Sequence, residues 1–222
     1  VAIDVLKNGG NAVDAAITAN TTMGLMEPTG NGIGGDLFAI IWDPASKQLY
    51  GLNGSGRSPR GQTLEALKER LEDRQSLPTF GSLSVSVPGV VDGWSELHNR
   101  FGALPWQQLF QPVIQYAREG FPVTQVISHV WAMNLEKYNA NKDDIEELDN
   151  FRKTYLIDGL PPQHGQVFKN SDLANTLEII SIKGRDAYYQ GEIADVIDAY
   201  MSRVAGPLRK SDLESHKSEW VE

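Results

Sequence analysis

Arg57 is the residue of this sequence whose type and surroundings best suit direct binding of a small anionic group. It lies in the segment 54–59, which reads Gly-Ser-Gly-Arg-Ser-Pro. A guanidinium is planar and carries its donors in a fixed fork, so on a glycine-rich loop it can bind a carboxylate in a bidentate manner. Position alone, however, favours an ordinary structural ion pair, and the loop by itself defines only a candidate carboxylate ligand.

A second glycine-rich segment, 30–35, matches the spacing GxGxxG of dinucleotide-binding proteins. That fingerprint requires a strand before the glycines and a helix after them, so that the pyrophosphate meets a helix N-terminus. Here a helical pattern ends at residues 27–28 and an apolar, strand-like run follows at 37–42. A nucleotide-binding module is therefore a remote alternative, and the glycines are expected to permit positive φ and close backbone packing.

The remaining residue types supply no complete catalytic set and no metal site. There is no cysteine, no Gly-x-Ser-x-Gly elbow and no carboxylate pair that stands out for acid–base work. An acidic cluster within 143–149 lacks the spacing of a calcium loop and is expected to be a solvated helix start. The four histidines are scattered, with no pair at helical metal-binding spacing: His98, His129, His164 and His216.

Composition limits the classes of partner. The chain has 222 residues, of which 41% are hydrophobic and 22% charged, as in ordinary globular proteins. Its net charge of −9 disfavours a nucleic-acid partner, since binding to phosphates requires clustered cations. No apolar run approaches the roughly 20 residues that span a bilayer. Helical spacing begins at Val1 without a cap, and the chain stops at residues 220–222 without a turn signal. We therefore expect a fragment, or one chain of a processed protein.

The two glycine-rich segments are positioned by a predicted β-hairpin. Residues 37–42 are apolar, β-branched and aromatic, and they predict a buried strand. A turn at 43–47 leads to a second strand at 48–53. Because one glycine-rich segment precedes the first strand and the other follows the second, both are expected at the same end of the hairpin.

The other elements are mostly predicted helices. Alternation of Ser with Leu or Val over 82–87 predicts a third, half-buried strand with its serines exposed, and Pro112 predicts a kink or break inside a helix. Ser171 is expected to cap a late helix. About seven helices and three strands suggest a single, incomplete domain over 1–222, with much of any sheet outside it. The end of a helix is predicted at 1–7, and a short turn at 211–214. The seven helices are predicted over 11–27, 63–74, 90–101, 105–119, 124–138, 171–183 and 193–204.

Residues 6–16, Leu-Lys-Asn-Gly-Gly-Asn-Ala-Val-Asp-Ala-Ala, closely resemble the early LxxGGNAVDAA signature of the γ-glutamyltransferase family. Further motifs follow in the family's order, so the resemblance runs nearly from end to end. Several ordered motifs are far more specific than any single one. They lie at 27–28, 32–38, 54–59, 85–89, 104–106, 109–112 and 120–123.

The resemblance implies an α+β fold that is part of an αββα sandwich, the fold of N-terminal-nucleophile hydrolases, here helix-rich. Members of the family cut themselves, and a threonine at the new N-terminus of the small subunit is the nucleophile. Val1 has no nucleophilic side chain, so this chain resembles the front part of a large subunit. It would contain no catalytic residue, require no cofactor or metal, and have its own small subunit as its main partner.

The resemblance also assigns site residues. Arg57 matches the family arginine that holds the substrate's α-carboxylate, and Gly32, Gly34 and Gly35 are expected to shape the backbone of the pocket. Ser58-Pro59 departs from the usual Glu that follows this arginine and is similar to the branch that includes cephalosporin (glutaryl) acylases. Three functions stay open: a γ-glutamyl hydrolase/transferase on glutathione-like amides, a glutaryl-type acylase, and an inactive member acting as a binding protein. The compartment also stays open.

Overall fold

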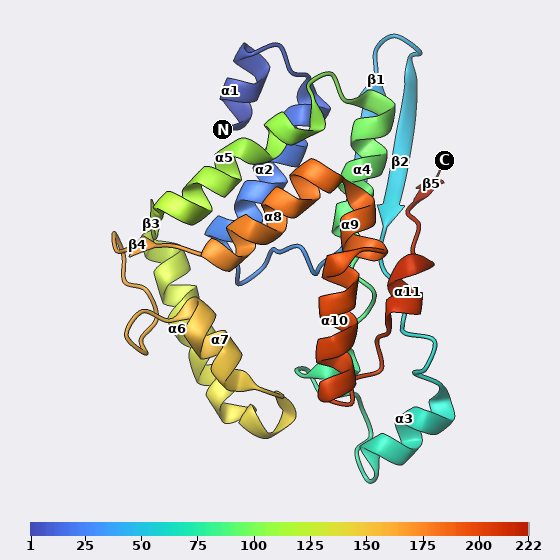
Figure 1. Cartoon of the computed structure of the whole chain (residues 1–222), viewed down its shortest axis with the longest axis vertical. Coiled ribbons are helices and arrows are strands. Elements are labelled where there is room, and N and C mark those ends of the chain that lie inside the picture. The colour runs from blue at the N-terminus through green and yellow to red at the C-terminus, as the bar shows by residue number, and fades with distance from the viewer. Residues whose placement is uncertain (222) are drawn as a thin grey trace.

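The computed structural model describes residues 1–221, which form eleven α-helices and five strands (Figure 1). The first part of the chain contains α1 (Ala2–Lys7), α2 (Ala12–Met26), β1 (Leu37–Asp43), β2 (Gln48–Gly54), α3 (Leu64–Leu71), the short 3-10 helix η1 (Ser82–Ser84), α4 (Val90–Phe101) and α5 (Trp106–Glu119). In Figure 1 the hairpin of β1 and β2 lies at the upper right of the molecule, and the N-terminal helix α1 lies at the upper left.

The second part of the chain is almost entirely helical. Among the described residues, no helix combines the length and the apolar character needed to cross a membrane. The elements are β3 (Phe121–Pro122), α6 (Gln125–Ala140), η2 (Lys142–Asp144), α7 (Leu148–Tyr155), β4 (Val167–Phe168), α8 (Ser171–Lys183), α9 (Arg185–Tyr189), α10 (Glu192–Arg203), α11 (Lys210–Glu214) and β5 (Glu219–Val221).

The main sheet is antiparallel, with strand order β1-β2-β5, and it confirms the predicted hairpin. Helix α4 lies against one face of the sheet. Gly93 of α4 allows the side chain of Leu37 to approach closely, because a Cβ at position 93 would lie only 2.9 Å from Leu37 Cδ2. On the other face Phe38 and Ile40 of β1 are 70% and 80% exposed. The prediction of a buried strand is therefore wrong for this face, because no described residue covers it.

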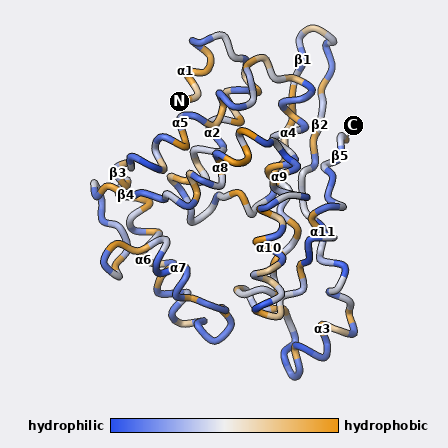
Figure 2. Tube along the Cα trace, in the orientation of Figure 1, coloured by the Kyte–Doolittle hydropathy of each residue, from blue (hydrophilic) through white to orange (hydrophobic). Residues whose placement is uncertain are grey.

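The core lies where α2, α4, α5 and α8 pack together, with Trp94, Phe110 and Leu177 fully buried. Figure 2 shows hydrophobic residues concentrated along these helices, whereas the outer ends near α3 and the α6–α7 turn are mainly hydrophilic. Burial of large side chains over these helices provides the main stabilisation, at roughly 25 cal/mol per Å² of apolar surface.

The segment 82–87 is not a strand, which corrects the prediction from its alternation. Residues Ser82–Ser84 form a 3-10 turn, and Ser82, expected to be exposed, is buried. Its hydroxyl donates to Glu146 Oε1 at 2.6 Å, and its backbone N–H donates to Glu146 Oε2 at 3.0 Å. The carboxylate of Glu146, which is distant in the sequence, therefore satisfies the backbone N–H that a neighbouring strand would otherwise have paired.

Two helix details also differ from the predictions. Helix α5 runs through Pro112 without a break, because Val113, Ile114 and the rest of its buried face are held against α2 and α8. The missing N–H of Pro112 removes one intrahelical bond, which this packing outweighs. The N-cap of α8 is Asn170 and not Ser171, since the Asn170 side chain accepts from Leu173 N at 3.0 Å.

Asp14 joins the N-terminal helices to the segment after α4. Its carboxylate accepts from the backbone N–H of Asn11 at 3.0 Å and thereby completes a capping box at the start of α2. The same carboxylate accepts from Ala103 N at 3.1 Å and Leu104 N at 3.2 Å. Asp14 is fully buried, so these three donors depend on it.

We predict that Asp14→Ala lowers the free energy of unfolding of the full-length protein by on the order of 3 kcal/mol, because three backbone donors lose their acceptor in a buried place. Chemical denaturation measures this. Asp172→Ala is the matched control, since Asp172 lies in the first turn of α8 but is exposed. Equal stability losses in the two variants would contradict the role of Asp14.

Candidate functional site

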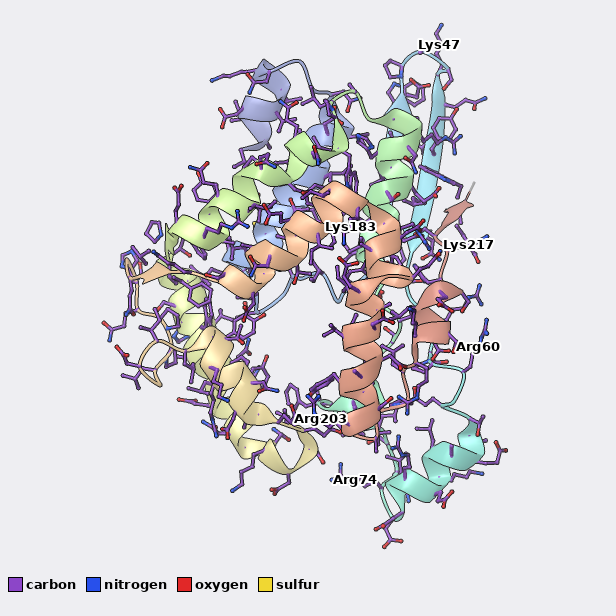
Figure 3. The ribbon with its side chains drawn as sticks, viewed as in Figure 1. Lys47, Arg60, Arg74, Lys183, Arg203 and Lys217 are labelled. Atoms are coloured by element: carbon purple, nitrogen blue, oxygen red, sulfur yellow. The ribbon has the colours of Figure 1, made fainter. Side chains whose placement is uncertain are left out.

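The two glycine-rich segments meet at one end of the hairpin, as predicted. Leu37 pairs with Gly54 in the sheet, which brings the residues before β1 next to those after β2. Beyond this pair, the Gly56 N–H donates to Asp36 Oδ1 at 3.0 Å. Lys47, in the turn of the hairpin, marks the opposite end (Figure 3). The predicted meeting of the two segments at one end of the hairpin is therefore confirmed.

A third segment, residues 87–90, holds both glycine-rich segments in place through backbone hydrogen bonds. Val87 N donates to the carbonyl of Arg57 at 2.9 Å, while Gly89 N and Val90 N both donate to the carbonyl of Gly35 at 2.9 Å. The contacts are so close that a Cβ on Gly56 would lie 1.5 Å from Val87 O. Glycine is required at this position because two backbones pass in direct contact.

Arg57 extends from this fastened loop into solvent. Its side chain is 84% exposed, and its Nη2 donates to Glu219 Oε1 at 2.8 Å. Among the described residues this is its one side-chain partner, so Nε and Nη1 are available to a ligand. Arg57 and Glu219 border a hollow of about 210 Å³, whose floor includes Val87 and His216. The arrangement can bind a small carboxylate.

Gly32, Gly34 and Gly35 line a different hollow, of about 490 Å³, between α2 and α4. Asn20 and Trp94 form its other side, with Trp94 Nε1 donating to Asn20 Oδ1 at 2.7 Å. The structure therefore does not bring these glycines into the hollow that Arg57 borders. The backbone segments that border the two hollows are linked, because Gly35 O and Arg57 O both accept hydrogen bonds from the segment 87–90.

Beneath the Arg57 loop lies a buried polar network that the sequence analysis missed. Asp92, in the first turn of α4, forms an ion pair with Arg185 of α9 and accepts from Ser218 N at 2.5 Å. Arg185 Nη2 also donates to His216 O at 2.6 Å. Tyr189 OH donates to Pro88 O at 2.8 Å. The network thus joins α4, α9 and the segment that leads into β5.

Opposing effects set the protonation of this network. Burial acts to raise the pKa of Asp92, but hydrogen bonds from Arg185 and Ser218 outweigh it and hold that pKa below its usual range. Burial lowers the pKa of His216, although Asp92, whose Oδ2 lies 3.8 Å from His216 Nε2, acts in the opposite direction. At neutral pH the network therefore contains a carboxylate, a guanidinium and a neutral imidazole.

The acidic cluster within 143–149 has structural partners. Asp144 pairs with Arg74 at 2.7 Å, and Glu147 binds Arg203 through both carboxylate oxygens, at 2.7 and 3.0 Å. Figure 3 shows Arg203 at the lower end of α10 and Arg74 in the region of α3. Residues 1–221 contain no group of three or more His, Asp or Glu side chains arranged to hold a metal ion.

We predict opposite outcomes for alanine at two glycines of the site. Gly56→Ala must displace the Arg57 loop, because its Cβ would overlap Val87 O, and we expect a fall in melting temperature of several degrees. Gly34→Ala serves as the control, since its Cβ would meet no atom within 4 Å. Thermal unfolding of the two full-length variants checks this; equal melting temperatures would contradict the close approach of the two backbones.

Comparison with known proteins gives one family. The chain matches the gamma-glutamyltranspeptidase family over residues 1–222. It is 30% identical over 221 residues to a glutathione hydrolase-like YwrD proenzyme of Bacillus subtilis, covering 98% of this chain and 39% of that protein. It is 32% identical over 222 residues to a glutathione hydrolase proenzyme of Pseudomonas aeruginosa, covering 100% of this chain and 38% of that protein.

Solved structures agree with this result. A cephalosporin acylase from Bacillus halodurans is 38% identical with a TM-score of 0.93, over 100% of this chain and 40% of that one. A gamma-glutamyltranspeptidase from Pseudomonas nitroreducens, complexed with L-DON, is 33% identical with a TM-score of 0.87, over 100% of this chain and 63% of that one. The predicted fold, a helix-rich α+β part of an N-terminal-nucleophile hydrolase, is thereby confirmed.

The chain spans about two-fifths of the length of the curated relatives it matches. Its match to the family nevertheless covers every residue from 1 to 222. The resemblance first indicated by the motif at residues 6–16 is confirmed, and the chain belongs to the gamma-glutamyltranspeptidase family.

Proposed function

We propose that this chain is the front part of the large subunit of a self-cleaving γ-glutamyl hydrolase/transferase that acts on glutathione-like γ-glutamyl amides. The observation that carries the proposal is Arg57, a guanidinium on a loop fastened by backbone hydrogen bonds and open to a ligand on its unpaired side. Relatives named glutathione hydrolases support the substrate class.

In this proposal the chain binds the substrate and the rest of the protein performs the chemistry. A threonine outside this chain attacks the γ-carbonyl through its hydroxyl oxygen, and the amide nitrogen leaves as an amine after taking a proton. Water or an acceptor amine then releases the acyl group. Arg57 holds the α-carboxylate and thereby fixes the distance between the acyl carbon and the nucleophile. Gly32, Gly34 and Gly35 shape the backbone of the second hollow, between α2 and α4.

An acylase that removes glutaryl-type side chains is the second candidate. The observation that favours it is the structural similarity to the cephalosporin acylase, together with Ser58-Pro59 after the arginine. A glutaryl group also ends in a carboxylate, so Arg57 suits both reactions. The two differ in the α-amino group, which only a γ-glutamyl substrate carries.

The exposed face of the sheet is the surface where we propose that the small subunit docks. Phe38, Ile40 and Trp42 alternate along β1 on this face, and Leu49 of β2 lies opposite Trp42. All four side chains are more than half exposed. A continuous apolar patch of this kind marks an interaction site, and proenzyme relatives support a second subunit made from the same precursor.

We predict that the full-length product cuts itself into two chains and releases the aniline from a γ-glutamyl anilide. Arg57→Ala should raise KM about 10–100-fold with a smaller change in kcat, because a charged hydrogen bond to the substrate carboxylate is worth roughly 1.5–3 kcal/mol. Intact mass, N-terminal sequencing of the new chain and steady-state kinetics measure these effects.

Arg118→Ala is the matched control, since Arg118 is also an exposed arginine with one carboxylate partner, Glu178. An uncut precursor would contradict the catalytic proposal and favour an inactive member that binds without reacting. Cleavage followed by normal anilide kinetics in Arg57→Ala would remove Arg57 from the site and favour a different acyl substrate.

We also predict that Ile40→Lys weakens association of the two chains, because it places a charge in the centre of the proposed docking face. Size-exclusion chromatography of the cleaved product should show separated or aggregated chains, or a precursor that fails to mature. Ile182→Lys, at an exposed apolar position of α8, is the control and should leave association unchanged. Intact heterodimer in both variants would show that this face is not the interface.

A further inference from the structure

A small hollow between α6, α7 and the loop that follows α2 has aromatic walls. Its volume is about 100 Å³, and Thr29 of the loop borders it. Its aromatic walls are Trp131 and Tyr138 of α6 and Phe151 and Tyr155 of α7. Figure 1 shows α6 and α7 at the lower left of the molecule, away from the hairpin of β1 and β2. This aromatic hollow therefore belongs to a part of the chain to which the proposed function gives no role.

The rings that line the aromatic hollow hold one another in place. Tyr138 and Phe151 meet edge to face with ring centres 4.8 Å apart, and Phe151 stacks on Tyr155 at 5.3 Å. Trp131 is 1% exposed, and its ring centre lies 6.1 Å from that of Tyr155. Aromatic contacts of this kind are favourable beyond the burial of their area. The walls are therefore an ordered cluster that is formed before any ligand arrives.

Three polar side chains at the aromatic hollow have no hydrogen-bond partner among the described residues. They are the amide of Asn134 and the hydroxyls of Tyr138 and Tyr155, and all three residues are half-buried. Burial raises the pKa of both tyrosines, and the neighbouring Tyr138 acts in the same direction on Tyr155, so both hydroxyls stay protonated at neutral pH. Polar groups in such places normally bond to the protein, to water or to a ligand. These three are available to a bound molecule.

Charge narrows the class of ligand. Among the described residues that line the aromatic hollow, none carries a charge. An anion would lose its hydration there without gaining a countercharge. A cation would need open ring faces, but the stacking of Phe151 on Tyr155 covers one face of each ring. A neutral ligand therefore fits this hollow best.

Size and hydrogen bonding narrow the class further. An apolar cavity of roughly 150 Å³ accepts one benzene ring. A partly open hollow of about 100 Å³ can therefore take a single ring and has no room for fused rings. A hydroxyl on that ring both donates and accepts, so it can accept from a tyrosine hydroxyl and donate to Asn134 Oδ1. A phenol combines these properties in one small molecule.

We propose that the aromatic hollow is a binding site for a neutral phenolic ring, whose hydroxyl bonds to Tyr138, Tyr155 and Asn134. The inference goes beyond the proposed function and does not depend on it, because such binding requires neither self-cleavage nor an acyl substrate. Contact with the aromatic walls supplies affinity, and the three polar groups fix the orientation of the ring. A ring without a hydroxyl leaves these groups unpaired, and binds more weakly for that reason.

The test is a ligand-observed NMR titration of the full-length protein with 4-methylphenol, toluene and 4-methylbenzoate, which share one substituted ring. We expect 4-methylphenol to bind about 10-fold more tightly than toluene, as for one or two neutral hydrogen bonds. The charged 4-methylbenzoate should bind more weakly than either. In the double variant Tyr138→Phe/Tyr155→Phe the advantage of 4-methylphenol over toluene should fall below about threefold. The Kd of toluene should change less than about twofold, because the ring shapes are kept.

Tyr116→Phe is the matched control, since Tyr116 is a tyrosine of α5 that does not line the aromatic hollow, and it should leave all three affinities unchanged. The double variant should melt at the wild-type temperature, because neither hydroxyl loses a partner. Equal binding of 4-methylphenol and toluene by the wild type, or an unchanged ratio in the double variant, would overturn the inference. Tighter binding of tetramethylammonium than of 4-methylphenol would overturn it in favour of a cation site, and no binding of any probe would leave only a gap in the packing.

Discussion

The ion pair between Asp92 and Arg185 is the interaction on which the candidate site depends. Asp92 is almost completely buried and Arg185 is 19% exposed, so both have lost most of their hydration. Removing one partner of such a pair typically costs about 3–5 kcal/mol, because the other is left as an uncompensated buried charge. Here the same carboxylate also binds Ser218 N, so the cost would fall on the strand that carries Glu219. Helix packing and the site are therefore coupled through one side chain.

A second constraint is the direct contact of three backbone segments without side chains between them. Gly56 and Gly89 lie where a Cβ would overlap Val87 O and Gly54 O, respectively. Backbone hydrogen bonds from residues 87–90 to Gly35 O and Arg57 O complete the contact. A loop held in this way loses little conformational entropy on binding a ligand, since its backbone is already ordered. This explains how an arginine on a glycine-rich loop can be both accessible and well placed.

The sequence could predict what depends on neighbouring residues. The hairpin and its two glycine-rich ends followed from alternation, turn residues and spacing along some thirty residues. The same pattern marked Arg57 only as a candidate, and its role as a carboxylate ligand is implied by the family resemblance. The Asp92–Arg185 pair could not be predicted, because its partners are 93 positions apart and nothing in their local pattern distinguishes them from surface charges. The segment 82–87 was predicted as a strand for the converse reason: its alternation is local, whereas the carboxylate that captures Ser82 is Glu146, 64 positions away. The exposed face of β1 also depends on what packs against it, which composition does not reveal.

Association and substrate recognition are linked by the geometry of the sheet. Arg57 and Glu219 are 84% and 59% exposed, and a pair with that exposure contributes little, because water and salt screen it. Glu219 lies in the same cross-strand row as Phe38, on the apolar face proposed for docking. A subunit that covers this face would also exclude water from the rim of the pair and strengthen its interaction with a charged ligand. This chain alone would then carry its donors and still bind a charged ligand weakly. Under the proposed function, full affinity would arise only when the sheet is covered, and recognition of the substrate would depend on association of the two chains.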